Sequence, residues 1–151
     1  MRATILIFII ILIFIIAGFY SGVLANSKPE EVKCKYGLSV MTDKAIYTAG
    51  EPIRIEMKIF NYTEENIVFH FNTSQRYDFI IEDEEGKEVW RWSADKMFAM
   101  VLGEEILGPA TPQTVYSEEY DGKINPGYYK MTAVFTASER PISGSVMIQI
   151  R

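Results

Sequence analysis

The chain has 151 residues and a net charge of −5, and its apolar residues are unevenly distributed. Residues 1–25 carry one charge, Arg2, and 20 of them are apolar, so the remainder is an acidic chain of about 42% apolar content, as in ordinary globular domains. A remainder of that length supports one hydrophobic core and is too short for two. Its acidity argues against a nucleic acid partner, because phosphates require a basic face.

The residue types exclude several chemistries. With one histidine, His70, and one cysteine, Cys34, the chain cannot assemble a zinc site from His and Cys ligands or a disulfide framework. It contains no glycine-rich phosphate-binding motif and no GxSxG nucleophile motif. The acidic run 82–85 lacks the spaced oxygen ligands of a calcium loop and is typical of a hairpin tip. We therefore expect no catalytic residues, no metal and no cofactor.

The first 25 residues form a leader. Residues 5–17 are almost entirely Ile, Leu and Phe and follow Arg2, which is typical of a secretory signal. Residues 23–25 place small side chains at the positions that precede a cleavage site. As a helix, residues 5–25 would span about 31 Å, enough to cross a bilayer uncleaved. The sequence therefore predicts an N-terminal hydrophobic helix in 1–25, either signal peptide or membrane anchor, with the domain outside the cytoplasmic membrane.

Residues 26–35 are polar, include Pro29 and are predicted to be a tether. Beyond them the apolar pattern has a period of two. Residues 53–59 alternate apolar and charged side chains without a fault, as expected for a strand with one buried face. Similar alternation occurs in residues 67–71, 77–82, 89–92, 129–135 and 146–150.

About seven to nine short strands, with no long helical period, predict an all-β fold for residues 36–151, an immunoglobulin-like antiparallel β-sandwich. Tyr129 stands two residues after a glycine and two before Met131, the arrangement of a tyrosine corner. Residues 93–113 are the least regular part of the domain. Ser93 could cap a short helical turn there.

Three pieces of the sequence resemble a known family: SQRYDF at 74–79, GKEVWRWS at 86–93, and Met97 with Phe98. They are similar to the bacterial intracellular proteinase inhibitor family, the BsuPI-type domain, and the resemblance extends through 50–53, Asn61 and 126–129. It implies a small all-β, immunoglobulin-like protein that inhibits subtilisin-type serine proteases without catalysis or cofactor. The family's namesake acts inside the cell, whereas the leader here implies a protease partner outside the cytoplasmic membrane.

Arg76, Asp78 and Arg91 are the first candidate partner-binding residues. They stand among aromatic residues of the family-like stretches, and Arg and Trp often dominate binding energy at interfaces. The same residues could instead stack on aromatic rings and pair with carboxylates, which would fix neighbouring strands to one another.

Phe98, Met100 and Leu102 are the second group. They belong to the continuous apolar run 97–102, which suits a protease cleft because an extended segment can pair through its main chain and fill pockets with its side chains. The run also fits a further strand or a loop folded over the core.

Two functions therefore stay open. One is an exported or membrane-tethered domain that binds and inhibits a subtilisin-type protease non-covalently. The other is an extracytoplasmic immunoglobulin-like adhesion or envelope module that binds another surface protein and no protease. The leader attaches either one to the membrane if it is not cleaved.

Overall fold

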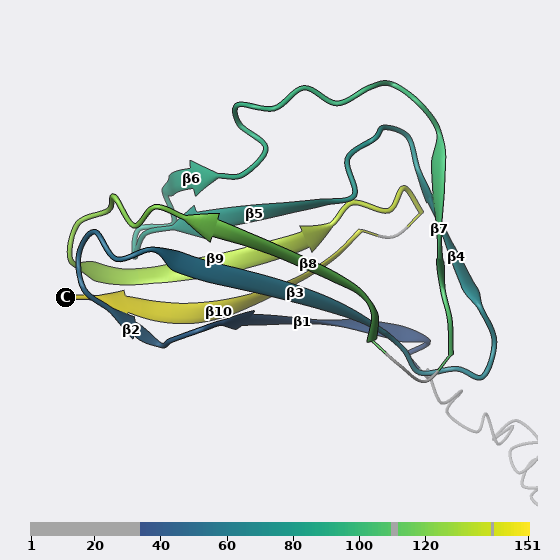
Figure 1. Ribbon diagram of the computed structural model, residues 1–151, viewed down its shortest axis with the longest axis horizontal. Coiled ribbons are helices and arrows are strands. Elements are labelled where there is room, and N and C mark those ends of the chain that lie inside the picture. The colour runs from purple at the N-terminus through teal and green to yellow at the C-terminus, as the bar shows by residue number, and fades with distance from the viewer. Residues whose placement is uncertain (1–33, 110–111, 140) are drawn as a thin grey trace, which may run out of the picture. The chain divides into compact units, whose positions relative to one another are not determined.

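Ten β-strands account for the regular structure in the computed structural model, which describes residues 34–109, 112–139 and 141–151 (Figure 1). Within those ranges no helix is long and apolar enough to cross a membrane. The predicted leader and most of the predicted tether lie outside the described residues. The strands are β1 (Tyr36–Thr42), β2 (Ile46–Tyr47), β3 (Ile53–Asn61), β4 (Ile67–Phe71), β5 (Tyr77–Glu82), β6 (Glu88–Arg91), β7 (Gly103–Leu107), β8 (Pro112–Tyr120), β9 (Gly127–Phe135) and β10 (Ile142–Ile150).

The strands form two larger sheets and one small one. The first sheet has the order β1-β3-β8, the second has the order β2-β10-β9-β5-β6, and β4 pairs with β7. Every pairing is antiparallel except that of β10 with the two-residue β2. Figure 1 shows β4 and β7 standing across one end of the other strands. The predicted all-β sandwich is confirmed, with ten strands rather than seven to nine.

The core lies between the facing sheets and follows the period of two. In β3 the side chains of Ile53, Ile55, Met57 and Ile59 are buried and Arg54 is exposed. The buried side chains of β9 meet them from the other sheet: Tyr129, Met131, Ala133 and Phe135. Burying a large apolar side chain contributes about 1.5–3 kcal/mol relative to exposure. This alternation therefore accounts for both the strands and their sandwich.

The sequence pattern missed four strands: β1, β2, β7 and β8. Most of β1 is only partly buried, so its sequence lacks a clean alternation. β7 is short and begins with Gly-Glu-Glu. β7 lies entirely, and β8 partly, in the segment 93–113 that we expected to be irregular. Ser93 starts no helix; two tight turns run there, closed by the Ala94 N–H to the Arg91 carbonyl at 3.2 Å and the Lys96 N–H to the Ser93 carbonyl at 3.1 Å.

Two side chains fix the sandwich locally. The Tyr129 hydroxyl donates to the Asn125 carbonyl at 2.9 Å, which confirms the predicted tyrosine corner. Asn61 is buried at the end of β3, and its amide donates to the carbonyls of Glu65 at 2.7 Å and Leu107 at 3.0 Å. Its carbonyl accepts the Thr63 N–H at 2.8 Å. Asn61 therefore ties the small β4–β7 sheet to the main sandwich.

Candidate functional site

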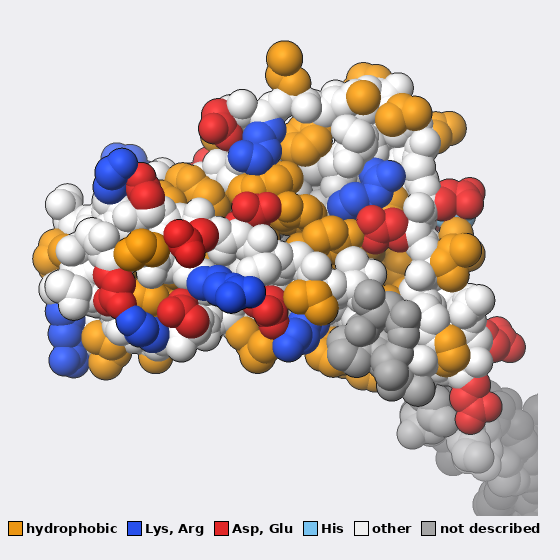
Figure 2. All heavy atoms as spheres, viewed as in Figure 1, with side chains coloured by type: hydrophobic (Ala, Val, Ile, Leu, Met, Phe, Trp, Pro, Cys, Tyr) orange, Lys and Arg blue, Asp and Glu red, His pale blue; other side chains and the backbone are white. Residues whose placement is uncertain are grey.

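The segment 92–102, which we call the β6–β7 loop, carries the three most exposed large apolar side chains of the described residues. Met97 is 99% exposed, Met100 86% and Leu102 80%. Figure 1 shows the loop arching above β5, and in Figure 2 orange side chains stand out along this edge. The apolar run 97–102 is therefore a loop rather than a strand, and most of its side chains are exposed. Such exposed apolar side chains mark an interaction site when they are contiguous.

Ser74 holds the loop at Ala99. The Ser74 N–H donates to the Ala99 carbonyl at 2.9 Å, and the Ala99 N–H donates to the Ser74 hydroxyl oxygen at 2.9 Å. We call these two bonds the Ser74 clamp. The Val101 N–H also donates to the Ala99 carbonyl at 2.9 Å and closes a three-residue turn. Met100 is the central residue of that turn and projects from its tip.

A column of aromatic rings supports the loop from below. The Phe98 ring, which is half-buried, lies 5.9 Å from the Trp92 ring between centroids. Trp92 stacks on Tyr77 at 4.3 Å, and Tyr77 stacks on Tyr116 of the opposite sheet at 4.3 Å. The Lys96 ammonium lies 4.7 Å from the centroid of Trp92. Aromatic and cation–π contacts of this kind contribute about 0.5–1.5 kcal/mol each, so the start of the loop is fixed to the sandwich.

Asp78 and Arg91 also fix the start of the loop. Asp78 is 5% exposed and accepts hydrogen bonds from Arg91 at 2.8 Å and from the Ser93 hydroxyl and N–H at 2.7 and 3.1 Å. Arg91 also donates to Glu88 at 2.6 Å. Hydrogen bonds to Glu88 and to Asp78 raise the pKa of Arg91. Both candidates therefore link β5, β6 and the turn that follows.

Arg76 stands below the end of the loop. Its guanidinium lies 4.3 Å from the Phe71 ring centroid, pairs with Glu105 at 3.4 Å and donates to the Thr73 carbonyl at 2.7 Å. Gly103 leaves room for this side chain, because a Cβ there would lie 2.2 Å from a guanidinium nitrogen. Arg76 therefore connects the end of the loop to the β4–β5 connection.

Two partly buried tyrosines beneath the loop, Tyr77 and Tyr116, each donate a hydrogen bond to a carboxylate. Burial, followed by the hydrogen bond to Glu118, raises the pKa of Tyr77. Burial and the hydrogen bond to Glu105 likewise raise the pKa of Tyr116, whose hydroxyl lies 2.7 Å from a Glu105 oxygen. Both hydroxyl groups therefore remain protonated at physiological pH, and the two rings act as packing groups.

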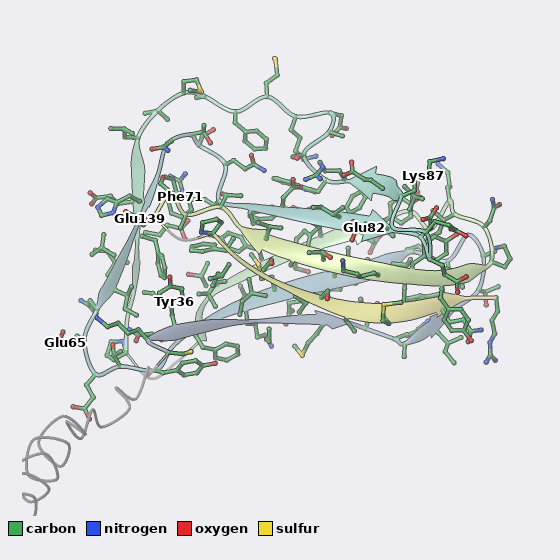
Figure 3. The ribbon with its side chains drawn as sticks, turned by 180° about the vertical axis from the view of Figure 1, so that it is seen from behind. Tyr36, Glu65, Phe71, Glu82, Lys87 and Glu139 are labelled. Atoms are coloured by element: carbon green, nitrogen blue, oxygen red, sulfur yellow. The ribbon has the colours of Figure 1, made fainter. Side chains whose placement is uncertain are left out.

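A hollow of about 500 Å³ adjoins the end of the loop at Leu102. His70 of β4 lies in it between Glu104, at 3.4 Å, and Glu139, which contacts the other ring nitrogen. Figure 3 shows Glu139 beside Phe71 at the small sheet. The lining of the hollow combines these charged side chains with the apolar side chains of Phe71 and Leu102.

Five of the six predicted partner-binding residues thus divide into two groups. Arg76, Asp78 and Arg91 make contacts within the domain, while Met100 and Leu102 are exposed. Phe98 lies between these extremes because one face of its ring rests on Trp92. Sequence reasoning missed Ser74, although it begins one of the family-like stretches, because its partner Ala99 lies 25 residues away with no pattern that connects them.

Comparison with solved structures finds distant likeness. The sporulation control protein Spo0M from Bacillus subtilis is 11% identical, with 78% of this chain and 50% of that chain covered and a TM-score of 0.50. A CARDB domain from Pyrococcus furiosus is 9% identical, covering 77% and 87%, with a TM-score of 0.47. The alkylpurine DNA glycosylase AlkC from Pseudomonas fluorescens is 14% identical at a TM-score of 0.48; the alignment covers 79% of this chain and 31% of AlkC. Likeness at this identity concerns the fold alone.

Comparison with curated proteins finds no match. A family model described as BsuPI, intracellular proteinase inhibitor, matches residues 40–140. The match includes the β6–β7 loop, the Ser74 clamp and the aromatic column, and it covers more than half of the chain. The chain therefore belongs to the BsuPI family of intracellular proteinase inhibitors.

Proposed function

We propose that this protein is an exported or membrane-tethered inhibitor that binds a subtilisin-type serine protease non-covalently. The observation that carries the proposal is the exposed apolar run of the β6–β7 loop, held on a rigid support inside the region that matches an inhibitor family. A loop held in one conformation before binding loses little conformational entropy in the complex. This favours tight binding by a small contact surface.

The chemistry of the loop suits a peptide-binding cleft. Proteases of this class bind an extended chain by main-chain pairing and select side chains with pockets. Met97, Met100 and Leu102 offer flexible, apolar side chains without a charge to desolvate. An apolar protease cleft is therefore the surface that the loop fits.

The location outside the cytoplasmic membrane is part of the same proposal. It is supported by the apolar leader 1–25 behind Arg2, which resembles a secretory signal or an anchor. The tyrosine corner and the facing antiparallel sheets support the immunoglobulin-like description of the domain, as found in many extracellular modules. The partner would then be a secreted or surface protease rather than an intracellular one.

The first test is a titration of the purified full chain, in mild detergent, against a subtilisin-type protease, with hydrolysis of a small peptide as the readout. Loss of activity at a one-to-one ratio, with the chain recovered uncut, supports the proposal. Absence of inhibition at micromolar concentration against several such proteases contradicts it. Affinity capture of a surface protein or envelope polymer without effect on proteolysis would then favour the adhesion or envelope module.

Export is tested separately with a C-terminal tag on the full chain. After fractionation of the expressing cells, we expect the tag in the medium or in the membrane fraction. If it is in the membrane fraction, protease added to intact spheroplasts should remove it. A control with Arg2 and residues 5–17 deleted should stay in the cytoplasm. A wild-type tag that remains cytoplasmic and protected would contradict export and leave the inhibitor proposal intact.

A further inference from the structure

The β6–β7 loop has one residue that is placed differently from its neighbours, Met100. Phe98 rests on Trp92, and both main-chain groups of Ala99 are occupied by the Ser74 clamp. Met100 follows directly, at the centre of the turn closed by Val101, and it is 86% exposed. The side chain thus projects directly after the residue that the Ser74 clamp holds.

The clamp also decides which main-chain groups a partner can reach. In an added strand, alternate residues pair with the partner and those between them face the other way. Ala99 already faces the inhibitor's own body through Ser74, so the residues on either side, Phe98 and Met100, are those left to pair with a protease. Met97 lies three residues before Met100 and is 99% exposed, which gives a second apolar side chain for a neighbouring pocket.

The clamp and the aromatic column hold the chain before Met100, and the start of β7 holds it after Leu102. Gly103 begins that strand and lies against Arg76, which is itself fixed by Thr73 and Glu105. A substrate leaves a protease when its two new ends separate, and product release commonly limits turnover. Fixing both flanks of the Met100–Val101 bond opposes that separation.

We infer that Met100 enters the primary apolar pocket of the protease and that Ser74 is the positioning residue that makes the loop an inhibitor rather than a substrate. This inference rests on the proposed function, and it names the side chain that determines which protease is bound: one that selects an unbranched apolar residue. Loops that bind in this way are cut slowly at the bond after the pocket residue, here between Met100 and Val101.

The test of Met100 uses the full chain with Met100→Glu, and Met147→Glu as a matched control on another exposed methionine, in β10. Against a subtilisin-type protease that accepts Met in its primary pocket, Met100→Glu should weaken inhibition by about 100-fold, as at a central interface residue. Met147→Glu should change it by less than about 2-fold, as peripheral contacts do. Equal inhibition by wild type and Met100→Glu overturns the assignment of the pocket residue.

The test of Ser74 compares Ser74→Ala with Ser74→Thr, which retains a hydroxyl, and with Ser138→Ala, another exposed serine. During long incubation with protease, Ser74→Ala should lose inhibition and intact mass spectrometry should find a cut after Met100. Ser74→Thr and Ser138→Ala should remain uncut for as long as the wild type. If Ser74→Ala survives as well as the wild type, the hydroxyl of Ser74 has no part in resistance to cleavage, and the role assigned to this side chain is overturned.

The wild type in the same assay separates this inference from the proposed function. A wild-type chain that inhibits while both Met100→Glu and Ser74→Ala behave like it overturns the inference alone. A wild-type chain that fails to inhibit but is cut after Met100 overturns the inhibitor function and retains Met100 as the pocket residue. A wild-type chain that neither inhibits nor is cut there overturns both.

Discussion

Asp78 fixes the start of the β6–β7 loop through its contacts with Arg91 and Ser93. Its carboxylate lies in a buried place and is satisfied by Arg91 and by both donors of Ser93. A buried carboxylate is stable only when such partners replace water. The same residue therefore joins strand pairing to the position of the loop.

Asp78→Asn tests this role because it retains the shape and replaces an acceptor by a donor. The new amide group would face Arg91 or Ser93, which are donors themselves, and we expect the free energy of unfolding to fall by about 2–3 kcal/mol in urea titrations. Asp95→Asn, at a carboxylate that is 87% exposed, should stay within about 0.5 kcal/mol. If Asp78→Asn lowered the free energy of unfolding as little as Asp95→Asn, the contacts of Asp78 with Arg91 and Ser93 would not stabilise the domain.

Tyr47 gives the domain a pH dependence on the alkaline side. Its side chain is buried and its hydroxyl donates to Asp43 at 2.7 Å. Burial, followed by that hydrogen bond, raises the pKa of Tyr47 to about 12. In the unfolded chain a tyrosine ionises near its ordinary value of about 10. The stabilisation from the neutral phenol is therefore complete below pH 10 and is lost between pH 10 and 12.

We expect the free energy of unfolding to fall across that interval by up to about 1.4 kcal/mol per pH unit for each such tyrosine. The raised pKa values of Tyr77, Tyr116, Tyr120 and Tyr129 add to the fall. In urea titrations at pH 8 to 12, Tyr47→Phe should show a shallower decline than the wild type. An identical slope in the two proteins would contradict the buried, neutral phenol.

At the scale of the elements, the turn between β8 and β9 fits closely against the turn before β3. Gly122 has a φ of 73°, and a Cβ there would lie 2.0 Å from the Glu51 carbonyl oxygen. Gly86 has a similar φ of 77° but open space around it. Substitutions at these two glycines therefore distinguish the cost of backbone strain from the cost of steric conflict.

Gly86→Ala should cost about 1 kcal/mol, the strain of a left-handed conformation alone. Gly122→Ala should cost more, about 3 kcal/mol or above, because two backbone segments must also move apart. Urea titration of both variants measures the difference. Equal losses of unfolding free energy would mean that the two turns can move apart without a measurable loss of stability.

The tip of the β6–β7 loop is exposed, and under the proposed function it contributes to binding and not to the core. Met100→Asp combined with Leu102→Asp should therefore leave the free energy of unfolding within about 0.5 kcal/mol of the wild type, as exposed positions do. The same double variant should abolish inhibition in the protease titration. A loss of folding would instead assign these side chains to the core.

At the scale of the whole molecule, the sequence predicted those strands of the sandwich that bury one face and expose the other. The alternation at Ile53–Ile59 and at Tyr129–Phe135 is a direct record of that burial. Partly buried strands such as β1 leave no such record. A period of two does not predict that Asp78 is buried, because its neighbour Phe79 is buried as well. Asp78 is covered by the turn at Ser93, which folds back over it.

The candidate site was likewise predictable only in part from the sequence. The apolar run 97–102 could be read from the sequence, but its exposure could not, since a core strand and a binding loop share that composition. The Ser74 clamp depends on the β4–β5 connection meeting the β6–β7 loop. Contacts between segments so far apart in the sequence arise only from the assembled sandwich.

The buried amide of Asn61 has a consequence for covalent modification. Asn61-Tyr62-Thr63 and Asn72-Thr73-Ser74 both match the acceptor pattern for N-linked glycosylation. In the folded domain the Asn61 amide nitrogen is committed to two carbonyls, whereas Asn72 is exposed. If the chain is translocated into microsomes, a glycan on Asn61 marks molecules modified before folding. A glycan on Asn72 alone marks domains that folded first, so the two sites report the order of events.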